Sequence, residues 1–190
     1  MPSRISVIIP AYNEEESISE LITSIKNNVT SSIKYEVIIV DDGSTDNTWK
    51  IIENQVNENN FLKGIRFLKN YGKSAALDIG FKNSSGEVII TMDADLQDDP
   101  IEIESLYNMI LDKNYDLISG WKKKRFDPIT KTLPSKFFNF VTRVFSGIKL
   151  NDFNCGIKAY KKSVVKSISI YGEMHRYIPL IAKWNGFNNI

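Results

Sequence analysis

The chain has 190 residues, is 42% hydrophobic and 25% charged, and carries a formal net charge of +1. These values are ordinary for one soluble globular domain with a core of its own. The single cysteine, Cys155, excludes an internal disulfide and a cysteine-based zinc cluster, and the single histidine, His175, excludes a histidine-rich metal site. The sequence has no signal-peptide pattern and no apolar run that would span a bilayer, so we expect a cytoplasmic location.

Charge is distributed unevenly along the chain. Residues 1–118 carry ten Lys/Arg and twenty Asp/Glu, a net charge of −10, whereas residues 119–190 carry fourteen Lys/Arg and three Asp/Glu, a net charge of +11. This asymmetry predicts that the second part faces something anionic.

Apolar periodicity predicts strands that alternate with helices. We expect strands at 5–9, 35–40, 64–68, 88–92 and 115–119, and helices at 14–29, 48–56, 71–81, 101–111 and 177–184. The alternation predicts an α/β fold with a Rossmann-like, mostly parallel sheet and helices on both faces. Ligands of such sheets bind beyond the carboxyl ends of the strands.

A run of acids follows the strand expected at 88–92. Asp93 and Asp95 are two residues apart, so an extended backbone points both carboxylates to one side, with Gln97 next in phase. These oxygen ligands suit Mg²⁺ or Mn²⁺, which usually take further ligands from water and from substrate phosphates. Buried together, such like charges are unfavourable unless a cation or a water-filled cleft receives them. The pattern therefore predicts a divalent-metal site.

The neighbouring acids have a simpler explanation. Asp98 and Asp99 precede Pro100, where the next helix is expected to begin, and either suits a helix N-cap. We favour that role for both of them.

Polar residues also follow the first two strands. Glu14 comes after the strand at 5–9, and Asp41 and Asp42 come after the strand at 35–40. We expect these side chains to converge with Asp93 at one edge of the sheet. No glycine-rich loop follows the first strand, which argues against a nicotinamide or flavin enzyme and against a P-loop protein.

Several segments carry a resemblance to a known family. Residues 7–14, 40–44 and 93–98 resemble family 2 glycosyltransferases with the GT-A fold. Residues 150–160 and 171–179 resemble the polyprenyl-phosphate branch of that family, which includes dolichyl-phosphate mannose synthase and undecaprenyl-phosphate glucosyltransferases.

The resemblance implies a reaction. It implies transfer of a hexose, with inversion, from a UDP- or GDP-sugar to a polyprenyl phosphate such as undecaprenyl or dolichyl phosphate, with Mg²⁺ or Mn²⁺ bound at Asp93, Asp95 and Gln97. It further implies a nucleotide-sugar pocket that contains Pro10, Tyr12, Glu14, Val40, Asp42, Lys73, Asp93, Ala94 and Asp95.

Simpler roles stay open for two of these residues and for Asp41. Glu14 equally suits the first turn of a helix, Asp41 suits a turn, and Lys73 suits a solvated helix start.

The acceptor side requires cations. A lipid phosphate is already anionic at neutral pH, so the site must hold it in line rather than deprotonate it. By resemblance, the residues on this side are Lys122, Lys131, Ser135, Asp152 and Arg176. The family commonly has arginine where this chain has Lys122 and Lys131, and lysine lacks the bidentate fork of arginine. We expect Arg176 to contact a phosphate and His175 to pack or cap a helix.

An apolar stripe lies among basic residues in the second part of the chain. Phe137, Val141, Val144, Phe145 and Ile148 repeat at helical spacing. Core packing and a helix on a membrane surface explain the stripe equally well. Together with the basic charge, the second explanation predicts peripheral binding to the cytoplasmic face of a membrane.

The given sequence stops at residues 188–190, where we expect a further strand to begin. Members of the family continue through a basic loop and membrane helices, so we expect one catalytic domain that is truncated at its C-terminus. Two other classes stay open: a non-catalytic protein that binds nucleotide sugars, and a protein that binds nucleic acid through its basic part. The acidic strand ends argue against the second class.

Overall fold

The computed structural model describes residues 4–30, 33–121, 139, 142–144 and 147–190. The described strands are β1 (Ile5–Ala11), β2 (Tyr35–Asp41), β3 (Leu62–Arg66), β4 (Val88–Thr91), β5 (Leu117–Ser119) and β6 (Lys158–Lys161). The described helices are α1 (Ile18–Asn28), α2 (Thr48–Glu58), α3 (Lys73–Asn83), α4 (Glu102–Asp112), α6 (Lys162–Ser167), the 3₁₀ helix η1 (Met174–Tyr177) and α7 (Ile178–Trp184).

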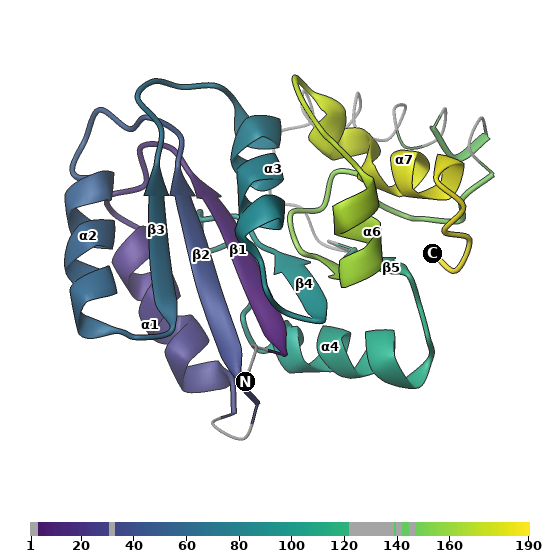
Figure 1. Cartoon of the computed structure of the whole chain (residues 1–190), viewed down its shortest axis with the longest axis horizontal. Helices are drawn as coiled ribbons and strands as arrows, with labels where there is room; N and C mark the ends of the chain where they lie inside the picture. The colour runs from purple at the N-terminus through teal and green to yellow at the C-terminus, as the bar shows by residue number, and fades with distance from the viewer. Residues whose placement is uncertain (1–3, 31–32, 122–138, 140–141, 145–146) are drawn as a thin grey trace.

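The strands form a six-stranded sheet in the order β3-β2-β1-β4-β6-β5, with helices on both faces (Figure 1). β1 pairs in parallel with β2 and β4, and β2 pairs in parallel with β3. β6 runs antiparallel to both of its neighbours. The predicted α/β class, with a mostly parallel sheet covered on both faces, is confirmed.

Among the described strands, β6 is the one that the periodicity did not predict; α6 and η1 were not predicted either. β6 is four residues long, and it begins with a buried lysine, Lys158, where a buried strand usually carries an apolar residue. A short run with a charged first residue gives a weak periodic signal. Its place in the sheet brings the basic second part of the chain against β4, whose end leads into Asp93.

The strands are apolar on both sides because helices cover both faces of the sheet. On one face, Val7 and Ile9 of β1 pack in a cluster with residues of α1, α2 and α4. On the other face, Ile8 packs with residues of α3, α6 and α7. Burial of one such side chain contributes about 1.5–3 kcal/mol, so the two clusters together hold the sheet between its helices.

β1 continues past Pro10, where we expected it to end. The pairing of β1 with β4 ends at Ile8, whereas its pairing with β2 extends to Ala11. Pro10 therefore lies where β1 has a neighbour on one side only, and the missing N–H is tolerated there.

The helix expected from residue 14 begins only at Ile18. The backbone N–H of Glu14 donates to Thr48 Oγ1 over 2.7 Å, and that of Glu15 donates to Asp46 Oδ2 over 3.3 Å. These bonds hold residues 14 and 15 against the start of α2, and residues 15–17 form a turn before the first residue of α1. This arrangement holds Glu14 close to the end of β2.

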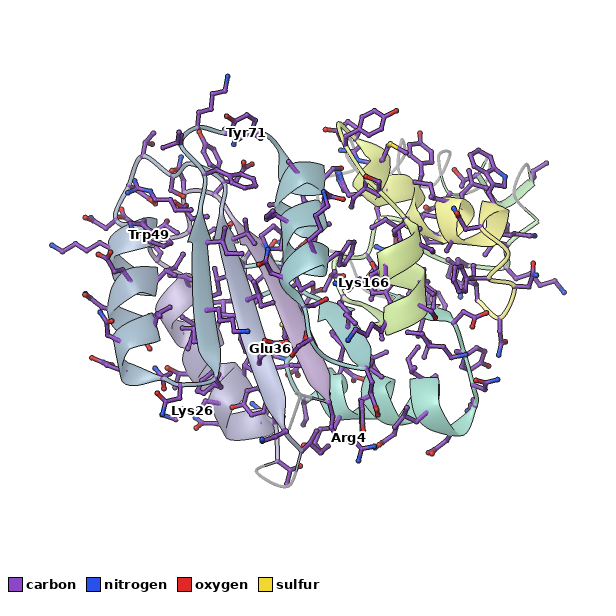
Figure 2. All side chains as sticks on the ribbon, in the orientation of Figure 1. Arg4, Lys26, Glu36, Trp49, Tyr71 and Lys166 are labelled. Carbon is purple, nitrogen blue, oxygen red and sulfur yellow. The ribbon has the colours of Figure 1, made fainter. Side chains whose placement is uncertain are left out.

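A buried acid, Glu36, joins the segments at the amino ends of the parallel strands. Glu36 accepts hydrogen bonds from Ser6 Oγ and Ser85 Oγ, both over 2.6 Å, and pairs with Lys63 Nζ at 2.6 Å. Burial raises the pKa of Glu36, but these donors outweigh burial and hold the pKa at about 2. In Figure 2, Glu36 lies low on the sheet and Tyr71 lies beyond its upper edge, so this network is remote from the strand ends described below.

Of the apolar stripe in the second part of the chain, Val144 and Ile148 are described. Ile148 is buried and Val144 is 64% exposed, whereas Phe137, Val141 and Phe145 lie outside the described residues. The two explanations of the stripe therefore both stay predictions. No helix in the described ranges combines the length and the apolar character that crossing a membrane requires.

Candidate active site

The carboxyl ends of β1, β2 and β4 lie side by side, and the start of α3 lies over them at the upper edge in Figure 1. They enclose a cavity of about 320 Å³, which we name the strand-end hollow. Its walls are Pro10, Ala11, Tyr12, Glu14, Asp42, Asn70, Gly72, Lys73, Asp93, Ala94 and Asp95. The structure thus brings together eight of the nine residues predicted for the nucleotide-sugar pocket.

Asp42 fixes one wall of the strand-end hollow. Its two carboxylate oxygens accept hydrogen bonds from the backbone N–H groups of Tyr71 and Gly72, over 2.7 and 2.9 Å. Gly72 has a φ of 92°, which favours glycine at this turn. The carboxylate of Asp42 therefore sets where α3 begins.

Lys73, the first residue of α3, reaches across to β4. Its Nζ lies 2.5 Å from Asp93 Oδ1, and both side chains remain partly exposed. The backbone N–H of Asp93 donates to Asp98 Oδ2 over 3.2 Å. A Cβ atom at Gly156 would overlap the carboxyl groups of both acids, so a glycine is required for β6 to approach them.

Asp93 and Asp95 fit the chemistry of a divalent metal. Both face the strand-end hollow, and hard cations such as Mg²⁺ and Mn²⁺ take carboxylate oxygens. Within the described ranges, no group of three or more His, Cys, Asp or Glu side chains is arranged to hold a metal. A cation on these two acids would take its other ligands from water and from a bound phosphate.

Gln97 does not follow the expected phase. Leu96 has a φ of 61°, and the backbone N–H of Gln97 donates to Asp95 Oδ1 over 3.1 Å. This turn ends the extended backbone, and Gln97 lines a separate cavity with Glu102 and Trp121. The prediction that Gln97 shares a side with the two acids is therefore corrected.

Asp98 and Asp99, both predicted to cap the next helix, have different partners in the structure. Asp99 Oδ1 accepts a hydrogen bond from the backbone N–H of Ile101 over 3.1 Å, at the start of α4. Asp98 is buried and supports the backbone of Asp93 instead. The N-cap residue of α4 is Ile101, and no side chain caps this helix, so the predicted N-cap role is wrong for both acids. Asp99 instead closes the turn before α4, and Asp98 belongs to the support of the site.

Two other predicted residues lie behind the site. Val40 is fully buried and packs with Ile38 and Ala76 beneath α3, so its side chain does not reach the hollow. Asp152 is also buried, and its Oδ1 accepts a hydrogen bond from the backbone N–H of Asn154 over 3.0 Å. Their placement suits support of the site rather than contact with a ligand.

A second cavity, of about 390 Å³, adjoins the first and shares Lys73 and Asp93 with it. We name it the cationic hollow. Its walls are Lys73, Leu77, Thr91, Asp93, Phe153, Asn154, Cys155, Gly156, Lys158, Tyr160, His175, Arg176 and Ile178. Three lysine or arginine side chains and one carboxylate line it, so the hollow suits an anion.

Lys158 is the most deeply buried of these cations. It is 4% exposed, its Nζ donates to the backbone oxygen of Cys155, and it makes no ion pair with any described residue. Burial lowers its pKa to about 8, and the nearby charge of Lys73 also lowers it. A buried ammonium group without a paired carboxylate is costly, and an anion in the cationic hollow would offset that cost.

His175 is held by α3. Ser74 Oγ accepts a hydrogen bond from the backbone N–H of His175 over 2.9 Å and lies 3.0 Å from Nδ1 of the ring. The Ser74 hydroxyl can then donate its own proton to Nδ1, which places the ring proton on Nε2. Burial and the charge of Lys73 lower the pKa of His175 to about 4, so the ring is neutral at pH 7. The expected packed histidine is thus also a wall of the cationic hollow.

Arg176 lines the same hollow and pairs with Glu173 at 3.2 Å, where both side chains are largely exposed. Lys122, Lys131 and Ser135 lie outside the described residues, and their acceptor-side roles stay predictions.

Comparison with known proteins adds to this geometry. The model of the family described as Glycosyl transferase family 2 matches residues 6–169. The chain belongs to that family. A dodecaprenyl-phosphate galacturonate synthase of Rhizobium johnstonii is 35% identical over 178 residues, which cover 92% of this chain and 53% of the relative. An undecaprenyl-phosphate 4-deoxy-4-formamido-L-arabinose transferase of Shewanella sediminis is 37% identical over 185 residues, which cover 96% and 55%.

Solved structures of the same fold confirm the expected GT-A architecture. A glucosyl-3-phosphoglycerate synthase from Mycobacterium tuberculosis, in complex with UDP, matches with a TM-score of 0.73 and 23% identity, over 94% of this chain and 64% of that one. A mannosyltransferase from Pyrobaculum calidifontis, in complex with GDP-Man and Mn²⁺, matches with a TM-score of 0.71 and 20% identity, over 99% and 54%. The chain spans about half the length of the curated relatives it matches.

Sequence reasoning missed Lys158, although a signal for it was present. A lysine between Ile157 and Ala159 interrupts an apolar run, and a charge in a buried strand usually has a function. The link between Ser74 and His175 had no such signal, because the two residues are 101 positions apart.

We expect His175 to titrate with a pKa of about 4 instead of its ordinary 6.5. The unfolded chain takes up this proton near pH 6.5 and the folded chain only near pH 4, so the free energy of unfolding falls as the pH drops between these values. NMR of the imidazole carbon-bound protons measures the midpoint without ambiguity, since the chain has one histidine. The chain in urea provides the reference, and a folded midpoint between pH 6 and 7 would contradict the assignment.

Proposed function

We propose that this chain transfers a hexose from a nucleoside-diphosphate sugar to a polyprenyl phosphate, with the help of Mg²⁺ or Mn²⁺ and with inversion at the anomeric carbon. The observation that carries the proposal is that the strand-end hollow and the cationic hollow meet at Asp93 and Lys73. A donor in the first and an anionic acceptor in the second would react at that junction.

The strand-end hollow suits the donor. It lies beyond the carboxyl ends of the strands, where α/β folds bind nucleotides, and it contains the acids that would hold the metal. A divalent cation there supplies charge neutralisation of the departing diphosphate. Two solved structures with this fold contain UDP, or GDP-Man with Mn²⁺, which supports a nucleotide in the corresponding place.

The cationic hollow suits the acceptor. Lys158 and Arg176 provide positive charge for a phosphate, and neutral His175 offers Nε2–H as a further donor. A phosphate oxygen then attacks the anomeric carbon as the bond from that carbon to the diphosphate breaks, and the nucleoside diphosphate leaves. No general base is needed because the phosphate is already ionised. The names of the two curated relatives contain dodecaprenyl phosphate and undecaprenyl phosphate, which supports this acceptor class.

The first experiment concerns the metal. We expect Asp95→Asn to abolish the increase in nucleotide-sugar affinity that Mn²⁺ produces, because a neutral amide is a weaker ligand than a carboxylate. Calorimetric titration of a panel of UDP- and GDP-hexoses, with and without Mn²⁺, measures this increase. Asp112→Asn, which changes an acid at the far end of α4, serves as the matched control. An Asp95→Asn variant that keeps the full increase rules out Asp95 as a ligand.

The second experiment concerns the acceptor. We expect Lys158→Met to raise the KM for undecaprenyl phosphate about tenfold or more, since a lost hydrogen bond to a charged group costs about 1.5–3 kcal/mol. Donor affinity should stay unchanged. Lys162→Met, an exposed lysine on α6, is the control. Transfer of radiolabelled hexose measures the rate, and NMR of the product should show the inverted configuration.

Two results of that assay oppose the proposal. An unchanged KM for undecaprenyl phosphate in Lys158→Met would contradict the proposal that the acceptor binds in the cationic hollow. Binding of a nucleotide sugar without any transfer by the wild-type chain would leave only a nucleotide-sugar-binding function.

We also propose that the chain binds the cytoplasmic face of a membrane peripherally. The net charge of +11 in residues 119–190 supports attraction to anionic lipids, and each basic residue near such a surface contributes about 1 kcal/mol. We expect co-sedimentation with vesicles that contain phosphatidylglycerol, little with neutral vesicles, and release by salt. Lys123→Glu combined with Lys124→Glu should weaken binding. Equal binding to neutral vesicles would contradict this attraction.

A further inference from the structure

The contact between Lys73 and Asp93 occupies an atom that a metal would need. Lys73 Nζ lies 2.5 Å from Asp93 Oδ1, at the junction of the two hollows. The side chains are 35% and 26% exposed, so the ion pair is at the cavity wall and open to exchange with solutes. An ammonium group and a divalent cation at the same carboxylate repel each other strongly.

The described residues provide few ligands for a metal at this place. Asp95, the other acid, already accepts a hydrogen bond from the backbone of Gln97. In the part of the chain that the structure describes, no third side chain of the usual ligand types joins the two acids. Without phosphate oxygens, a cation would therefore have to displace the Lys73 ammonium group from Asp93, and its only ligands would be two carboxylates and water.

A bound diphosphate changes this balance. It brings oxygen ligands for the metal and, at the same time, negative charge for a displaced ammonium group. The backbone of Lys73 is held in place, because Asp42 binds the adjacent N–H of Gly72. The flexible side chain can move alone, and it already lines both hollows where phosphates would lie.

We propose that Lys73 exchanges with the divalent cation. It neutralises Asp93 before the donor binds, and it moves to phosphate oxygens when the cation and the nucleotide sugar bind together. The nature of the anion rests on the proposed function. The consequence is that cation and nucleotide increase each other's affinity by the same factor, as thermodynamic linkage requires.

The experiment measures Mn²⁺ affinity from the electron paramagnetic resonance signal of free Mn²⁺, with the full 190-residue chain, in the absence and presence of UDP or GDP. For the wild type, we expect weak binding of Mn²⁺ alone and an enhancement by nucleotide of about 5- to 150-fold, the usual range of coupling between sites. For Lys73→Met, we expect Mn²⁺ alone to bind about tenfold tighter and the enhancement by nucleotide to shrink by the same factor.

Two control variants separate exchange from other effects. Lys82→Met lies at the other end of α3 and removes an ion pair of the same length, 2.5 Å, to Asp78. We expect it to leave both affinities unchanged. Lys158→Met removes a cation of the cationic hollow that makes no ion pair with Asp93. It should raise the affinity for Mn²⁺ alone much less than Lys73→Met does.

Two outcomes overturn the exchange. One is a Lys73→Met variant that is folded by circular dichroism and binds Mn²⁺ alone no tighter than the wild type. The other is an equal rise in the affinity of Lys158→Met for Mn²⁺ alone, because the effect would then come from the loss of any nearby positive charge and not from the contact with Asp93. Failure of the proposed function is distinguishable, because it would appear as no binding of UDP, GDP or their sugars, while the effect of Lys73→Met on Mn²⁺ alone would remain.

Discussion

The site depends on two hydrogen bonds that the Asp42 carboxylate accepts from the backbone N–H groups of Tyr71 and Gly72. They fix the turn before α3, and the next two residues then act on different parts of the molecule. Lys73 pairs with Asp93 at the end of β4, and Ser74 holds His175 of η1. A carboxylate directly after β2 therefore positions, through Gly72, Lys73 and Ser74, both the acidic side and the basic side of the site.

The antiparallel strand β6 decides where the two charge distributions meet. Its first residue, Lys158, lies opposite Thr91, two positions before Asp93. Gly156 allows the segment before β6 to approach the carboxyl groups of Asp93 and Asp98 closely. The acidic first part of the chain and the basic second part thus come together at one cavity wall, where Asp93 lies beside Lys73 and close to Lys158 and Arg176.

Burial gives the basic groups of this wall different properties. It lowers the pKa of Lys158 to about 8, which leaves the ammonium group mostly protonated at neutral pH, and the pKa of His175 to about 4, which leaves the imidazole neutral. It raises the pKa of Cys155 to about 11, with a contribution from Asp98, so that this thiol is not a nucleophile at neutral pH. One wall therefore presents a cation, a neutral hydrogen-bond donor and an inert thiol.

The sequence by itself determined the fold class and the edge of the sheet where the site lies. Buried strands leave an apolar run that ends in polar residues, and both features are local, so Asp42, Asp93 and Asp95 could be placed at strand ends without a structure. Gln97 was misplaced because the reversal at Leu96 depends on a single backbone angle, which the alternation of residues does not report.

Only the tertiary structure decided how the basic residues are used. The contact of Ser74 with His175 and the entry of β6 beside β4 join segments far apart in the chain. Local propensity carries no information about such contacts, since they follow from how the helices and strands pack. The sequence shows a lysine within an apolar run at Lys158, but its burial in the wall of the cationic hollow and the lack of an ion pair with any described residue follow only from the packing.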